Sequence, residues 1–570
     1  MAAPVGSSCD AVTGCVSCLT FSSLGIEPLI AHYSLRWLLA ASVGLLAAVG
    51  LSSSALAEGK RPNILFLFAD DWGRQASAYA ALDGPGGISD AVQTPNFDQL
   101  AKQGVLFRNA FVNAPSCTPC RSSLLSGQYF WRTGRGAILQ GAVWDPAIPS
   151  WPMLVKDRGY HLGKSWKVWS PGTPSDAPYG QQQHAYQRAG GRINQFSQQA
   201  TRLVAQGESL PDAKAELLGE VRENFQAFLA DRPADQPFCY FFGPTNVHRK
   251  WVRGSGLALW GIDPDSLKGK LPPFLPDVPV VRQDLSDYLG EAQAFDAAIG
   301  VLVEELRRSG EYENTLIAVS GDHGPAGFPH GKCNLYDFGV RVALAISGPG
   351  VQGGRVVDDF VSLPDLAPTF VEAAGGTAPS VMTARNLWPV LKSTEAGLVD
   401  PERTWVLTGR ERHVAKARAG QLPYPQRAIR TDDYLFIINF RPDRYPLGDP
   451  FLLDSDRPPT SQQVTENTFV TLPDEDAGPT KAWLVEHRND SQGKTFFDHA
   501  YGRRPREELF DLKKDPHQMH NVAEDAAYQS VAAKLRQQLL DELQRSGDPR
   551  LMQDGQFFET PPMSGPVGGK

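Results

Sequence analysis

The stretch NILFLFADD, residues 63–71, decides the fold of this chain, because a continuous apolar run ends directly in two carboxylates. Such a run predicts a strand buried on both faces of a sheet, with Asp70 and Asp71 at its C-terminal end. The segment LIAVSGDH, residues 316–323, repeats the arrangement, and FCYFFG, residues 238–243, is a third apolar run. Because open α/β sheets bind ligands outside the carboxyl ends of their strands, these three ends predict one shared site.

Helical patterns between these runs predict an α/β fold for a large domain over residues 58–395. From Asp287 to Arg308, apolar residues recur at helical spacing, and Gly310 can stop this helix. Residues 358–375 predict a turn followed by a short helix.

Beyond about Asp400 the pattern changes. Residues 434–439 alternate in the manner of a strand and residues 531–543 look helical, which predicts a smaller C-terminal α+β domain over 400–550. The last residues, 551–570, are polar and contain Gly and Pro, so we expect a flexible, loosely held tail.

The composition excludes one broad class of function. The chain has 570 residues, a formal net charge of -8 and a pI near 5.8. A nucleic-acid binder would normally present a basic face to the phosphates, so we expect no nucleic-acid partner. Any anionic substrate must instead be bound by a few local cationic groups.

The N-terminal residues predict export. Trp37 to Leu51 is an apolar run directly after Arg36, and Ala55-Leu56-Ala57 follows as a small-residue cleavage site. Residues 1–57 are therefore predicted to be a signal peptide, and the mature chain is expected in the periplasm or outside the cell. The alternative is a membrane anchor, but the run is shorter than the roughly 20 residues that span a bilayer. We expect no stable membrane anchor.

The cysteines do not form a disulfide scaffold. Three of them leave with the leader, and the mature chain keeps Cys117, Cys120, Cys239 and Cys333. Cys239 lies inside an apolar run, where a buried small hydrophobe is the favoured interpretation.

The segment SCTPCRSSLLSG, residues 116–127, carries the most specific pattern. Pro119 favours the first turn of a helix whose free amides attract anions, and Arg121 can add a positive fork for a sulfate or phosphate oxygen. A redox pair is conceivable for Cys117 and Cys120, since a helix start lowers a thiol pKa. A zinc half-site is weaker, because no second pair of ligands completes it.

A third interpretation includes more of the chain. CTPCRSSLLSG resembles the signature of the type I sulfatases, with Cys120 where that family often has Ser. Further blocks resemble sulfatase blocks in the same order: PNILFLFADDWG, TPNFDQLAKQGVLFRNAF, GDHG, KCNLYDFGVRVALAI, LPDLAPTF and ELFDLKKDP. The resemblance implies an alkaline-phosphatase-like fold with a large mixed, mostly parallel sheet flanked by helices. It also implies that a formylglycine-generating enzyme oxidises Cys117 to formylglycine, whose hydrate attacks sulfur.

The resemblance also implies a metal site. Asp70, Asp71, Asp322 and His323 correspond to the family's metal ligands, together with residue Cys117, and carboxylate oxygens favour one calcium ion. The family often has Asn where His323 stands; the Asp-His pairing is similar to iduronate sulfatases, and an imidazole favours transition metals more than Asn does. Two adjacent carboxylates after an apolar run repel each other without a cation.

Three further catalytic residues follow from the resemblance. Lys332 matches the lysine that touches the sulfate and the leaving-group oxygen, and His248 matches the histidine that protonates the departing alkoxide. In GYHLGKSWKVW, residues 159–169, the position of the family's active-site lysine selects Lys167 over Lys164. Trp169 replaces the family's histidine. The candidates to substitute for it are His161, His184 and His330.

These residues predict a sulfatase that hydrolyses sulfate esters, with a sulfated small molecule or glycan as the substrate. The metal, Lys167 and Arg121 hold the hydrate and the sulfate, while His248 and Lys332 assist the leaving alcohol. Loops containing Arg410 and Arg412 are expected to face an anionic polysaccharide. A phosphodiester or phosphonate-ester hydrolase is the second possibility, and a non-catalytic glycan-binding relative is the third.

Overall fold

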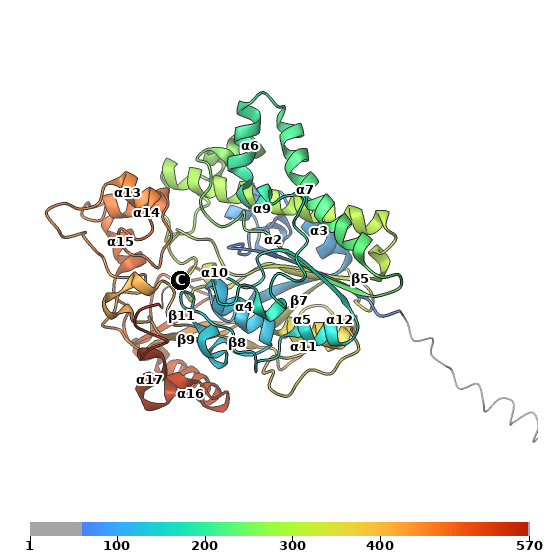
Figure 1. The fold of residues 1–570 in the computed structure, drawn as a ribbon. Coiled ribbons are helices and arrows are strands. Elements are labelled where there is room, and N and C mark those ends of the chain that lie inside the picture. The colour runs from blue at the N-terminus through green and yellow to red at the C-terminus, as the bar shows by residue number, and fades with distance from the viewer. Residues whose placement is uncertain (1–59, 568–570) are drawn as a thin grey trace, which may run out of the picture. The chain divides into compact units, whose positions relative to one another are not determined.

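A seven-stranded sheet lies at the centre of the computed structural model, which describes residues 60–567 (Figure 1). The predicted signal peptide, residues 1–57, lies outside the described residues. The strand order is β3-β4-β1-β5-β6-β2-β7, and β6 alone in this sheet runs antiparallel to its neighbours. The bounds are β1 Asn63–Ala69, β2 Val105–Phe111, β3 His161–Trp166, β4 Phe238–Gly243, β5 Thr315–Gly321, β6 Leu344–Ser347 and β7 Arg355–Ser362. The predicted mixed, mostly parallel sheet is confirmed.

Strand β1 is buried on both faces, as its apolar run predicts. Ile64, Phe66 and Phe68 belong to one core, while Leu65 and Leu67 belong to the core on the opposite face. Figure 1 shows the helices in two layers, one on each side of the sheet. One layer contains α2 Ser77–Asp83, α3 Pro95–Gln103, α6 Phe196–Ala205, α7 Leu210–Asp231, α8 Ser255–Trp260 and α9 Pro279–Arg308. The other contains α4 Cys117–Ser126, α5 Trp151–Asp157, α11 Leu366–Ala373 and α12 Trp388–Lys392.

Two predicted boundaries are corrected. Helix α9 begins at Pro279 rather than Asp287, because Pro279 occupies the first turn and Val281 and Leu285 extend its buried stripe. Residues 358–362 are the end of strand β7 rather than a turn, because this segment pairs in parallel with β2 and buries Phe360 in the core.

A smaller antiparallel sheet follows in the chain, in the order β11-β10-β9-β8. Its strands are β8 Trp405–Arg410, β9 Gln426–Thr431, β10 Tyr434–Asn439 and β11 Glu507–Asp511. One face, with Leu435 and Ile437, packs into the same core as α4 and α5, whereas Phe436 on the other face packs with helix α16 Gln529–Arg545. The predicted smaller α+β domain is confirmed.

The prediction of a loosely held tail is wrong for the described residues 551–567. Phe558, on the short helix α17 Gln556–Glu559, and Met563 are buried against the second sheet. Two apolar side chains therefore hold a segment whose composition is otherwise that of a loop.

The remaining helices are α10 Asp337–Val340, α13 Ser461–Glu466, α14 Pro479–Glu486 and α15 Lys494–Tyr501. Among residues 60–567, no helix combines the length and apolar character needed to cross a membrane.

Candidate active site

Four neighbouring strands end at one edge of the central sheet and bring the predicted residues together. In the order β3-β4-β1-β5 these strands are parallel, so their carboxyl ends lie side by side. Lys167 follows β3, His248 follows β4, Asp70 and Asp71 follow β1, and Asp322 and His323 follow β5. The three apolar runs thus lead to one site, as expected from the rule for open α/β sheets.

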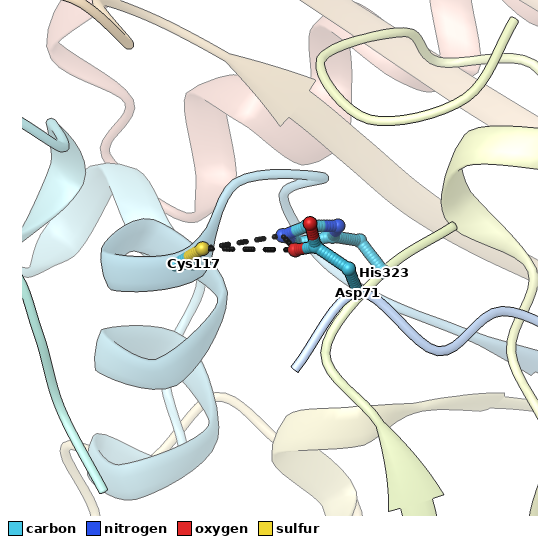
Figure 2. Close-up of side chains that lie close together, drawn as sticks. All are labelled: Asp71, Cys117 and His323. Atoms are coloured by element: carbon cyan, nitrogen blue, oxygen red, sulfur yellow. Dashed lines mark hydrogen bonds and ion pairs between the residues drawn. The ribbon is translucent and has the colours of Figure 1, made fainter. Parts of the chain in front are cut away.

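Helix α4 adds Cys117 to this site. The helix begins at Cys117, with Ser116 in an extended conformation before it, so the free amides of the first turn lie beside the cysteine. Figure 2 shows the Cys117 side chain pointing toward Asp71 and His323; Sγ lies 4.0 Å from Asp71 Oδ1 and 3.5 Å from His323 Nε2. Burial, together with Asp70, raises the pKa of the Cys117 thiol well above its usual value. An unmodified Cys117 is therefore a neutral, weak nucleophile.

The carboxylates and the imidazole form a cluster suited to a divalent cation. His323 Nε2 lies 3.3 Å from Asp71 Oδ1 and 3.5 Å from Asp322 Oδ1. His323 Nδ1 lies 3.0 Å from the carbonyl oxygen of Gly324, which can only accept, so Nδ1 is the donor there and Nε2 faces the carboxylates. Asp70 joins the same cluster, whose ligand atoms lie within 4.8 Å of one another in groups of three. This oxygen-rich donor set fits a hard divalent metal.

Arg121 lies behind the carboxylates instead of facing an open space. Its Nε donates to Asp322 at 2.9 Å and one Nη donates to Asp70 at 3.3 Å, while the other donates to the carbonyl oxygens of Lys167 and Val168. The side chain is fully buried. The sequence predicted a fork for a sulfate oxygen, whereas the structure shows the guanidinium orienting two of the proposed metal ligands.

Two lysines and a histidine lie beside the carboxylates of the cluster, and of these His248 is the most exposed, at 31%. Lys167 Nζ donates to both oxygens of Asp70, at 2.6 and 2.7 Å. Although burial opposes the charge of Asp70, Lys167 and Arg121 hold the pKa of this carboxyl well below its usual range. Lys332 Nζ lies 3.2 Å from Asp71 Oδ2, and His248 Nε2 lies 3.8 Å from the same oxygen.

The structure places Lys167, and not Lys164, at the site. Lys164 Nζ donates to Asp176 at 2.6 Å and lies in a buried ion pair of its own. Trp169 is buried, and its indole donates to Ser122 on α4 at 2.8 Å. Its position therefore supports the helix that carries Cys117.

None of the three histidines considered as substitutes at position 169 contacts Cys117. His161 packs on Phe228, His184 packs near Tyr179, and His330 lies 3.0 Å from His499. Instead His413, which the sequence did not single out, lies 2.8 Å from Ser116 Oγ through its Nδ1. Burial lowers the pKa of His413 to about 3, so this imidazole is neutral beside the start of α4.

The cysteine geometry does not favour the redox or the zinc interpretation. Cys120 is a free thiol that packs in the hydrophobic core with Leu124. Among the described residues, two of the three groups that could hold a metal contain Cys117, the third consists of Asp70, Asp71 and His248, and none contains Cys120. Cys239 is buried in the core, as a small hydrophobe would be.

The connection between strands β10 and β11 of the second sheet contributes a further residue near the site. Asp476, which the sequence analysis missed, lies 3.2 Å from Lys332 Nζ. Arg410 and Arg412 were expected to face a polysaccharide, but both are buried. Arg410 donates to Asp474, and Arg412 donates to backbone carbonyl groups. No sequence pattern could have identified Asp476, because it is an acidic residue in a loop far along the chain from the other site residues.

Comparisons with known proteins agree with this geometry. A family model described as Sulfatase matches residues 62–376. N-sulphoglucosamine sulphohydrolase of Homo sapiens is 28% identical over 504 residues, covering 85% of this chain and 90% of that protein.

Two solved structures share the fold. One, in complex with its substrate D-glucosamine-2-N,6-O-disulfate, has a TM-score of 0.57 at 19% identity and covers 86% of this chain and 99% of its own. Phosphonate monoester hydrolase of Agrobacterium radiobacter also has a TM-score of 0.57 at 19% identity, covering 86% and 97%. The central sheet and its helices therefore have the alkaline-phosphatase-like arrangement that the sequence resemblance implied.

The protein thus combines this fold with a cysteine at a helix start, a carboxylate cluster and facing lysines. The relatives that it matches include named sulfatases and sulfohydrolases, which supports a sulfuric ester hydrolase. Since the family model covers more than half of its 570 residues, the chain belongs to the sulfatase family.

Proposed function

We propose that the protein hydrolyses sulfate esters of a sulfated carbohydrate, using formylglycine at position 117 and one calcium ion. The observation that carries this proposal is the position of Cys117 at the first turn of α4, with Sγ directed at Asp71 and His323. A residue in this position faces the donor set that fits a divalent cation and the amides that attract an anion.

Asp70, Asp71, Asp322 and His323 would hold the metal. Carboxylate oxygens are the ligands that calcium prefers, which supports calcium over a soft metal, although the imidazole is an unusual fourth donor for it. When bound, the ion supplies positive charge that stabilises the nucleophilic oxygen of residue 117 and the sulfate oxygens.

The chain's own side chains divide into two groups by position. Arg121 lies on the buried side, where it orients Asp70 and Asp322. Lys167, Lys332 and His248 contact Asp70 and Asp71, and from there they can bind sulfate oxygens and assist the leaving group. His248 Nδ1 lies 2.6 Å from the carbonyl oxygen of Arg249, which leaves Nε2 directed toward the site.

A carbohydrate is the substrate class that the comparisons support best. The name of the human relative specifies a sulfo group on the nitrogen of glucosamine, which supports a carbohydrate substrate but not the ester linkage. The fold alone does not separate this proposal from a phosphonate or phosphodiester hydrolase, since a phosphonate monoester hydrolase shares it. The described residues show one carboxylate cluster of this kind at the site, whereas two-metal phosphoryl transfer uses a second.

The proposal includes maturation and export. A formylglycine-generating enzyme would modify Cys117, and the apolar run at Trp37 to Leu51 would direct the chain to the periplasm or out of the cell.

The test is to produce the protein with a formylglycine-generating enzyme and to weigh the peptide that contains residue 117. The modified enzyme is then assayed on sulfated oligosaccharides, aryl sulfates and phosphate diesters. We expect the mass loss of the thiol-to-aldehyde conversion and a preference for the sulfate esters. Faster hydrolysis of phosphate diesters, or equal activity of the unmodified cysteine form, would contradict the proposal.

A further inference from the structure

Asp476 is a charged residue near the site that the roles above leave unexplained. It belongs to the acidic run DED, residues 474–476, between α13 and α14. The two neighbouring carboxylates of this run have partners of their own: Arg410 and Arg418 for Asp474, and the Tyr501 hydroxyl for Glu475. Asp476 alone of the three pairs with Lys332.

The segment that carries Asp476 is anchored on both sides. Before it, Asp474 pairs with Arg410 at 2.6 Å and accepts a hydrogen bond from the Val414 amide at 2.9 Å. After it, the Thr480 hydroxyl donates to Asp284 of helix α9 at 2.7 Å. Because both anchors are buried, the position of Asp476 relative to the central sheet is well defined.

Lys332 lies between two carboxylates. Its Nζ is 3.2 Å from Asp71 Oδ2 and 3.2 Å from Asp476 Oδ2, and the lysine side chain is only 4% exposed. Asp71 is also a proposed metal ligand, so its negative charge is shared with the metal cluster. Asp476 is the second anion near the ammonium, and it belongs to none of the groups of described residues that could hold a metal.

This arrangement controls where the Lys332 N–H groups point. An ammonium has three donors; Lys332 donates one to Asp71 at 3.2 Å, while the charge of Asp476 at 3.2 Å attracts the ammonium from a second carboxylate, so donors remain for a substrate oxygen. Without Asp476, Coulombic attraction would draw the ammonium toward Asp71 and away from the leaving group.

We propose that Asp476 is a positioning residue that holds Lys332 in place to stabilise the leaving-group oxygen. The inference rests on the proposed sulfatase function, in which Lys332 acts on that oxygen. It means that the segment beyond the second sheet's β10 completes an active site built on the edge of the first sheet.

The test uses Asp476→Asn, which removes the charge and keeps the size of the side chain. The modified enzyme is assayed on a series of sulfate esters, from nitrophenyl sulfate, whose leaving group departs easily, to a sugar sulfate, whose leaving group departs poorly. Because assistance matters most for a poor leaving group, kcat/KM should fall less than about threefold for nitrophenyl sulfate and more than about tenfold for the sugar sulfate.

Two comparison variants separate positioning from general stability. Asp498→Asn changes an exposed carboxylate of α15 that pairs with Lys494, and it should leave every substrate unaffected. Asp365→Asn removes the buried partner of Arg403, which does not anchor this segment, so it should lower the melting temperature and reduce activity equally on all substrates. In a Lys332→Met background, Asp476→Asn should produce no further change in the leaving-group dependence.

An equal loss on all substrates, or no loss, would overturn the inference. If Asp476→Asn does not fold, Asp476→Ser replaces it in the same series. Asp476→Glu keeps the charge and should retain the parent's dependence of kcat/KM on the leaving group. A folded Asp476→Glu variant whose kcat/KM depends on the leaving group as steeply as that of Asp476→Asn would also contradict the inference. Failure of the parent enzyme to cleave any sulfate ester would instead contradict the proposed function.

Discussion

Arg121→Lys distinguishes between orienting the metal ligands and binding the sulfate. The guanidinium donates to Asp322 at 2.9 Å, to Asp70 at 3.3 Å and to the carbonyl oxygens of Lys167 and Val168 at 3.1 and 3.3 Å. Lysine keeps the positive charge, but its single ammonium cannot occupy the three nitrogen positions of a planar fork. Asp70 and Asp322 should therefore lose part of their orientation.

The expected effect is a loss of metal affinity. Removing a partner that orients metal ligands typically weakens binding about 10- to 100-fold, which corresponds to about 1.4 to 2.7 kcal/mol. Calorimetric titration of metal-free enzyme with calcium measures this directly, and kcat/KM for a sulfate ester at saturating calcium measures what remains. We expect saturating calcium to restore much of the lost activity.

The opposite pattern would refute this reasoning. A calcium affinity within about twofold of the parent, combined with a KM raised at every calcium concentration, would mean that Arg121 binds the sulfate. Arg385→Lys is the matched control, because Arg385 is a partly exposed arginine that pairs with Asp400. It should change neither calcium affinity nor KM.

Three further substitutions test the site and the core. Cys117→Ser, made in a host that modifies cysteine but not serine, should stop after at most one turnover, because a serine sulfate has no second hydroxyl on the same carbon. Peptide mass detects the trapped sulfate adduct. Sustained turnover would contradict the formylglycine role. Cys120→Ser should keep activity within about tenfold at unchanged formylglycine content, since Cys120 packs in the core; its melting temperature should fall slightly, and a larger loss of activity would argue for a chemical role. Burial raises the pKa of Glu291 to about 7, although hydrogen bonds from Ser197 and Asn246 oppose this shift. The folded state therefore binds the Glu291 proton more tightly than the unfolded state does. As a result, the free energy of unfolding falls as pH rises from about 4.3 to about 7. Glu291→Gln should therefore raise the melting temperature relative to the parent more at pH 8 than at pH 5, and equal shifts at both pH values would contradict this linkage.

Much of the central sheet was predictable because its strands are continuous apolar runs. The sequence placed strands at 63–69 and 238–243, and both lie there in the structure. The boundary errors have a shared cause. The start of α9 and the strand at 358–362 depend on packing against neighbours, which local patterns do not reveal.

The candidate site was predictable wherever it follows a strand or a specific motif. Asp70, Asp71, Asp322 and His323 come directly after apolar runs, and Cys117 lies in the sulfatase-like segment. The role of Arg121 in orienting the proposed metal ligands was not predictable in the same way. Its carboxylate partners, Asp70 and Asp322, follow strands β1 and β5, and only the folded chain brings all three side chains into contact.

The sequence by itself determined the apolar runs, the carboxylates that follow them, and the helix that begins at Cys117, because these depend on neighbouring residues in the chain. The tertiary structure alone decided that β3, β4, β1 and β5 lie side by side, since strand pairing joins segments far apart in sequence. It also decided the partners of the charged side chains. Asp476 is 144 positions from Lys332 (476 minus 332), and a contact at that separation leaves no local pattern, because the bonds of Asp474 to Arg410 and of Thr480 to Asp284 that position it join segments far apart in the chain.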